Sequence, residues 1–175
     1  FHNYSDYGML INEALFRSNH IVLNGGKRYV IKTPIIIGKG QHLDGNGATI
    51  VNETGTYCIE LTSVVGEPCV LENVVVENGK GFIIKGPNIT VKDCVFKNVE
   101  KCIYVPTGFN SYEFFCSNCH MHGDTLIETG IVVDATDCSF DNITMLNYKY
   151  PMVIGGGNTK VNNLHPWIGI GIENR

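Results

Sequence analysis

Basic residues and long apolar stretches are both scarce in this sequence of 175 residues. Charged residues make up only 17% of it and the net charge is −4, so the chain offers no basic surface for the phosphates of a nucleic acid. No apolar run approaches the roughly 20 residues that a membrane-spanning helix needs. The composition therefore argues against nucleic acid as a partner and against insertion into a membrane.

An initiator methionine and a secretion signal are also missing from the visible chain. The sequence begins at Phe1, no charged segment followed by an apolar one comes after it, and the last residues, 168–175, still resemble a strand. We therefore expect this chain to be a fragment of a longer polypeptide.

Helical periodicity is absent after about residue 20, which confines any helix to the N-terminus. Ser5 and Asp6 can cap a short helix whose apolar stripe is expected at Met9, Leu10, Ala14 and Leu15. The helix should end near Ser18–Asn19. We expect residues 1–20 to form a capping helix segment and residues 21–175 to form a separate β structure.

The seven cysteines are too many by one for complete pairing within the chain. Most lie inside apolar strand-like runs, which favours buried free thiols and folding in a reducing compartment such as the bacterial cytoplasm. Cys116 and Cys119 form a Cys-x-x-Cys pair beside His120 and His122. In a strand, neighbouring side chains alternate between faces, so Cys119 points inward with Met121 while both histidines point outward. We therefore predict no metal site, and no other motif calls for a cofactor.

A repeat begins at residue 69 and dominates the rest of the sequence. An Asn or Asp precedes a short apolar strand at positions roughly 20 to 25 residues apart, which is within the range of solenoid repeats. A second apolar run follows about eight residues beyond each first strand, so we expect insertions at one corner only. The corner residues are Asn73, Asp93, Asn118, Asn142 and Asn163, and the second runs contain Phe82–Ile84, Cys102–Tyr104, Leu126–Ile127, Pro151–Ile154 and Ile170–Ile172.

These features predict an all-β fold, a right-handed single-stranded parallel β-helix with a short N-terminal capping helix. Each coil would stack on the next about 4.8 Å away and share one core with it. Asn and Asp at a corner tolerate the left-handed backbone of a sharp bend, and stacked side chains there can form hydrogen bonds along the column. A β-sandwich or a propeller would instead show regularly spaced hairpin turns.

The N-terminal coils resemble the entrance of the pectate-lyase-like β-helix superfamily, in which bacteriophage tailspikes and tail appendages are frequent members. The resemblance rests on Leu10–Leu15, Ile21–Leu23, Gly26–Ile31 and Gln41–Ile50. It implies a virion tail protein, folded in the bacterial cytoplasm as a homotrimer, that binds a bacterial surface polysaccharide or teichoic acid. Two alternatives stay open: a secreted polysaccharide-degrading enzyme, more a hydrolase than a lyase, or a non-catalytic structural spacer.

The activity motifs of this superfamily are not found in the chain. The three arginines lie outside the regular repeat, which leaves lyase chemistry unsupported, and the polygalacturonase motifs are absent. A glycosidase needs two carboxyl groups about 5 to 9.5 Å apart. Asp124 and Glu128, in the longer insertion after Asn118, are the first candidates for catalysis, followed by Asp134 and Asp137. The alternative is that all four are solvated corner carboxylates.

Aromatic side chains late in the repeat are the candidates for glycan binding. Flat aromatic faces stack on sugar rings and provide a large contact area at low entropic cost. Exposed aromatics can equally close the end of a solenoid or pack against another subunit. The candidate binding residues are Tyr148, Tyr150, His165 and Trp167.

Overall fold

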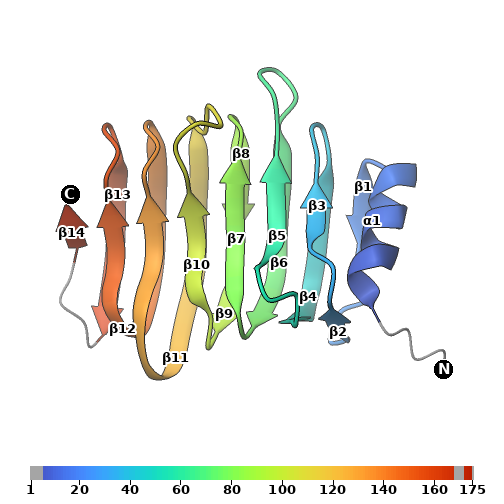
Figure 1. Ribbon diagram of the computed structural model, residues 1–175, viewed down its shortest axis with the longest axis horizontal. Coiled ribbons are helices and arrows are strands. Elements are labelled where there is room, and N and C mark those ends of the chain that lie inside the picture. The colour runs from blue at the N-terminus through green and yellow to red at the C-terminus, as the bar shows by residue number, and fades with distance from the viewer. Residues whose placement is uncertain (1–5, 168–171, 175) are drawn as a thin grey trace.

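The computed structural model describes residues 6–167 and the backbone of residues 172–174. Strands account for 63% of the chain and form a parallel β-solenoid of about 6 turns, preceded by one short helix. Figure 1 shows the strands stacked side by side along the long axis, with helix α1 (Tyr7–Arg17) at the N-terminal end. The predicted all-β solenoid with an N-terminal helix is confirmed. Within the described part of the chain, no helix has the length and apolar character needed to cross a membrane.

Each turn of the solenoid has three faces, which we call A, B and C in chain order. Face A consists of β1 (His20–Val22), β8 (Ile89–Lys92) and the first segments of β4 (His42–Asn52), β6 (Cys69–Glu77), β11 (Phe114–Val133), β12 (Cys138–Ile154) and β13 (Lys160–Trp167). Face B consists of β2 (Arg28–Ile31), β9 (Val95–Lys97) and the following segments of β4, β6, β11, β12 and β13. Face C consists of β3 (Ile35–Ile37), β5 (Tyr57–Thr62), β7 (Lys80–Lys85), β10 (Glu100–Val105), β14 (Ile172–Asn174) and the last segments of β11 and β12.

The predicted Asn and Asp residues do form the corner between faces A and B. All five have a positive φ, between 49° and 56°, the left-handed conformation that Asn and Asp tolerate best. Asn118 Nδ2 donates to Asp93 Oδ1 at 3.1 Å, and Asn142 Nδ2 donates to Asn118 Oδ1 at 2.9 Å. This column of side chains therefore links successive coils, as the sequence predicted.

The other two corners carry similar columns that the sequence analysis did not identify. Positive φ values recur at the same place in successive coils, because each sharp bend needs a left-handed residue. The B/C corner contains Asn78, Asn98 and Asn147, and the C/A corner contains Asn88, Glu113, Asp137 and Asn158.

One of the predicted second runs is wrong, and another, Ile170–Ile172, lies largely outside the described residues. Leu126 is 60% exposed, and the face C strand of this coil is Ile131–Val133, which pairs with Ile103–Val105. The pairing of β11 with β12 shifts between His122 and Ile127, where β11 carries extra residues. Insertions are therefore not confined to the C/A corner, because this coil also has a longer B/C corner.

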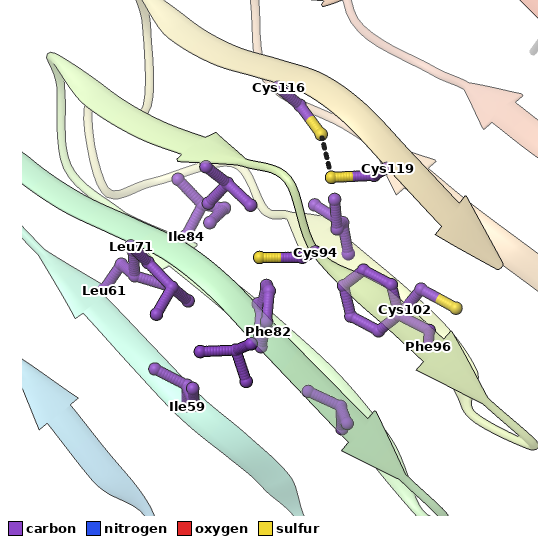
Figure 2. Close-up of a cluster of buried hydrophobic side chains, with 14 of the residues drawn as sticks. Ile59, Leu61, Leu71, Phe82, Ile84, Cys94, Phe96, Cys102, Cys116 and Cys119 are labelled. Carbon is purple, nitrogen blue, oxygen red and sulfur yellow. Dashed lines mark hydrogen bonds between the residues drawn. The ribbon is translucent and has the colours of Figure 1, made fainter. Parts of the chain in front are cut away.

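Aliphatic, aromatic and cysteine side chains from all three faces fill the interior (Figure 2). All seven cysteines are buried free thiols, as predicted. Sγ of Cys116 lies 3.7 Å from Sγ of Cys119, and Cys94 lies in the same cluster. Burial raises the pKa of the Cys69 and Cys138 thiols to about 12, which keeps them protonated and unreactive near neutral pH.

Helix α1 covers the N-terminal end of the core. Asp6 caps it by accepting from the Gly8 N–H at 2.9 Å, and the helix ends at Arg17, near the predicted position. Burial opposes ionisation of Asp6, but hydrogen bonds from Thr33, Lys32 and Gly8 outweigh it and lower its pKa. The predicted stripe is only partly correct: Leu15 is buried with Ile11 and Gly8, whereas Met9 is 63% exposed.

Candidate functional site

Two columns of outward side chains run along face B. They lie two and four residues beyond the A/B corner residue of each coil, and strand pairing places equivalent positions beside one another, about 4.8 Å apart from coil to coil. The column at position two contains Val75, Val95, His120, Thr144 and His165, and the column at position four contains Glu77, Lys97, His122, Leu146 and Trp167.

A polar hollow of about 240 Å³ lies where face B meets the B/C corner. Three consecutive coils contribute to it, because its side chains come from β6, β9 and β11 and from the corners that follow them. Two carboxylates, one ammonium group, one imidazole and two amides face a single small space. The lining residues are Glu77, Asn78, Lys97, Asn98, His122 and Asp124.

Asp124 is held in the hollow by a reciprocal pair of hydrogen bonds. Asn98 Nδ2 donates to Asp124 Oδ2 at 2.5 Å, and the Asp124 N–H donates to Asn98 Oδ1 at 2.6 Å. Asn98 is itself a left-handed corner residue with φ 56°. The Asp124 carboxylate is thereby fixed relative to the preceding coil.

Glu77 contacts two cations, of which Lys97 lines the hollow and Arg28 does not. Its carboxylate accepts from Arg28 Nη1 at 2.5 Å and lies 3.8 Å from Lys97 Nζ. The Glu77 side chain is mostly buried, whereas more than half of the Lys97 side chain is exposed. The ammonium group of Lys97 therefore remains accessible to a ligand while its position is restrained.

Asp124 and Glu128 take part in different contacts. Glu128 forms an exposed ion pair with Lys149 Nζ at 2.9 Å, in the next coil, and does not line the hollow. The second carboxylate that lines the hollow is Glu77, two coils before Asp124, which the sequence analysis missed. Asp134 and Asp137 lie elsewhere, the first in a hollow with residues 106–108 and 110–112 and the second at the C/A corner.

The four predicted aromatic residues do not share one surface. His165 and Trp167 project from face B as expected, and Trp167 is 65% exposed. Tyr150 is half-buried at face C, with Lys149 Nζ 5.0 Å from its ring centroid. The expectation of an exposed Tyr148 is wrong, because this residue is fully buried and its Oη donates to the Val99 carbonyl at 2.9 Å.

The repeat itself could have revealed the missed residues. Glu77, Lys97 and His122 each follow an A/B corner residue by four positions, so aligning the coils on that corner places them in one column. The longer B/C corner is what brings Asp124 up to this column. The neighbouring repeats share the column, but their B/C corners are shorter, so the alignment alone would not have revealed Asp124.

The predicted separation of thiols and imidazoles is confirmed. Cys119 and Met121 are buried, while His120 and His122 are exposed. Among the described residues, no three His, Cys, Asp or Glu side chains gather in a way that could hold a metal ion.

A second charged cluster lies on face A, and its side chains contact one another. The rings of His20 and His42 stack 4.4 Å apart, and Glu72 contacts His42 Nε2 at 2.5 Å and Lys92 Nζ at 2.6 Å. Hydrogen bonding from Lys92 holds the pKa of Glu72 below its usual value, burial opposes this, and His42 adds to it. These contacts join neighbouring coils and leave few groups for a ligand, unlike the hollow on face B.

Comparison with models of known protein families gives no match for this sequence, and neither does comparison with curated proteins.

Proposed function

We propose that this solenoid recognises a bacterial surface polysaccharide or wall teichoic acid through face B. The observation that carries the proposal is the polar hollow around Asp124 on the same face as the exposed ring of Trp167. Carboxylates and amides suit sugar hydroxyl groups, an indole ring stacks on a sugar ring, and Lys97 and His122 suit the anionic groups of an acidic glycan. A parallel solenoid presents its outward side chains along one extended face, which suits an extended polymer.

We further propose that the protein acts as a bacteriophage tailspike or tail appendage, as a homotrimer on the virion tail. The β-solenoid and the resemblance of its N-terminal coils to the entrance of such proteins support this assignment. Light scattering combined with size-exclusion chromatography would measure the mass of the assembly. A monomer at all concentrations would contradict the trimer.

Glycan binding is tested by immobilising capsular polysaccharides and wall teichoic acids and measuring the affinity of the protein for each. Replacing Trp167 with Ala should weaken binding of the recognised polymer about tenfold, which corresponds to about 1.4 kcal/mol of lost stacking and contact. Phe16→Ala is the matched control, because Phe16 is a 90% exposed ring on helix α1. No binding to any polymer would favour the spacer, and equal losses in both variants would exclude face B as the site.

Hydrolysis of the bound glycan is the second candidate, because two carboxylates, Asp124 and Glu77, share the hollow. Such a pair can supply the acid and the base or nucleophile of a glycosidase. Newly formed reducing ends would be measured for Asp124→Asn, Glu77→Gln and Glu128→Gln. We expect the first two changes to abolish release and the third to leave it intact. Loss of release in Asp124→Asn and Glu128→Gln, but not in Glu77→Gln, would restore the pair first considered from the sequence.

A further inference from the structure

A larger hollow of about 460 Å³ lies at the C/A corner, away from face B. It extends over three successive coils, because its residues belong to β11, β12 and β13 and to the corners that precede them. The side chains with chemistry suited to a ligand are Glu113, Phe115, Asp137, Ser139, Thr159 and Lys160.

Strand pairing places an aromatic ring, a hydroxyl group and an ammonium group in a row along this hollow. Phe115 pairs with Ser139, and Ser139 pairs with Lys160, so the three lie in consecutive coils of face A. The Phe115 ring is 53% exposed. Lys160 forms no ion pair with any residue that the structure describes. An apolar surface and an available donor therefore lie in one row, with Ser139 between them.

Two carboxylates border the same row at the corner. Glu113 and Asp137 both have φ 56°, and the Glu113 N–H donates to the Asp137 carbonyl at 3.0 Å, so they occupy equivalent positions in adjacent coils. Asn88 Nδ2 donates to the Glu113 carboxylate and fixes its direction. Both groups are acceptors for hydroxyl donors at one edge of the hollow.

An unsatisfied hydroxyl group also lies in the lining. Thr159 Oγ1 is the only buried side-chain nitrogen or oxygen among the described residues that has no hydrogen-bond partner. Such groups are rare in folded proteins because burying them without a partner is costly.

We propose that this hollow is a second saccharide-binding site, which holds one pyranose ring with free hydroxyl groups. The C–H face of the sugar packs on Phe115, while its hydroxyl groups donate to Glu113 and Asp137 and accept from Lys160. The inference rests on the proposed function for its class of ligand, but none of its residues belongs to the face B site. Two sites on one solenoid would hold separate units of a polymer and raise the avidity for it.

The test is a titration of the isotope-labelled protein with simple methyl glycosides, in which NMR measures the changes in the chemical shifts of the backbone amides. The probes are the methyl glycosides of glucose, galactose, mannose and N-acetylglucosamine. At least one should shift the amides of Phe115, Ser139 and Lys160. Phe115→Ala should weaken this binding at least fivefold, and Asp137→Asn, which retains a residue suited to positive φ, should also weaken it. Phe109→Ala is the matched control, because Phe109 is 48% exposed and does not line the hollow.

The outcomes separate this site from the one on face B. If no glycoside shifts these amides, or if Phe115→Ala binds as tightly as the unchanged protein, the second site is wrong, whatever the polymer assays show. If the shifts occur and depend on Phe115 while Trp167→Ala leaves polymer binding unchanged, the second site stands and the face B site fails. Loss of the shifts in the Phe109→Ala control would mean that the effect is not local and would also overturn the proposal.

Discussion

Tyr148 and Tyr150 are two positions apart in the sequence, yet they have different chemical environments. The ring of Tyr148 fills the core, where its hydroxyl group donates to the Val99 carbonyl and contacts Cys102 Sγ at 3.1 Å. Burial raises the pKa of Tyr148, and proximity to Cys102 raises it further. Tyr150 is only half-buried and contacts the Lys149 ammonium group. At the scale of one residue, burial decides whether an aromatic side chain stabilises the fold or is available to a ligand.

This difference predicts unequal effects of the same substitution. Tyr148→Phe should lower the free energy of unfolding by about 1 to 3 kcal/mol, because it leaves the buried Val99 carbonyl with only the weak Cys102 thiol donor at 3.4 Å. Tyr150→Phe should change it by less than about 0.5 kcal/mol, as expected for surface positions. Urea unfolding followed by circular dichroism measures both. Equal effects would mean that the Tyr148 hydroxyl group is not needed for stability.

At the scale of elements, each corner joins one strand to the next, and the column of corner side chains joins one coil to the next. At each corner the backbone enters the left-handed region, and side chains of neighbouring coils form hydrogen bonds to one another. Asn118 shows both features: its backbone is left-handed, and its side chain donates to Asp93 and accepts from Asn142. The same geometry holds the functional candidates, since Asp124 depends on Asn98 and the C/A hollow depends on Glu113 and Asp137.

Two substitutions of Asn118 separate these contributions. Asn118→Ala should cost about 2 to 3 kcal/mol, because it loses the ladder bonds and removes the short polar side chain that lets Asn tolerate positive φ. Asn118→Gly should cost only about 1 kcal/mol, because glycine adopts positive φ without strain and loses only the ladder bonds. Thermal and urea unfolding would measure both variants. A glycine variant less stable than the alanine variant would contradict the left-handed corner.

Stacked coils form one continuous core at the scale of the whole molecule. Thiols from face A, face B and face C lie inside it, among them Cys94, Cys102, Cys116 and Cys119 (Figure 2). All seven cysteines are free and buried. Burial raises the pKa of the Cys58 and Cys102 thiols well above the usual range. Because the thiolate is the reactive form, both access and ionisation protect Cys58 and Cys102. Hydrogen bonds from Cys116 and Cys94 lower the pKa of Cys119, so burial alone protects that thiol.

The folded protein should therefore resist thiol reagents. In a neutral solution of Ellman's reagent we expect no rapidly reacting thiol, and we expect all seven to react once the chain is unfolded in guanidinium chloride. Absorbance at early and late times measures the two populations. A thiol that reacts within seconds in the native protein would show that part of the core opens readily.

The sequence by itself determined the solenoid, its N-terminal helix, the column of Asn and Asp at the A/B corner and the free buried thiols. Those features repeat or depend on near neighbours, so a pattern of residue types is enough to specify them. It did not determine that Ile131–Val133 rather than Leu126–Ile127 completes its coil, or that Tyr148 turns inward. The sequence also did not show that Asp124 and Glu77 line the same hollow, or which residues form the hollow at the C/A corner. These depend on the path of each insertion and on contacts between residues roughly one or two coils apart, and only the stacked tertiary structure sets such distances.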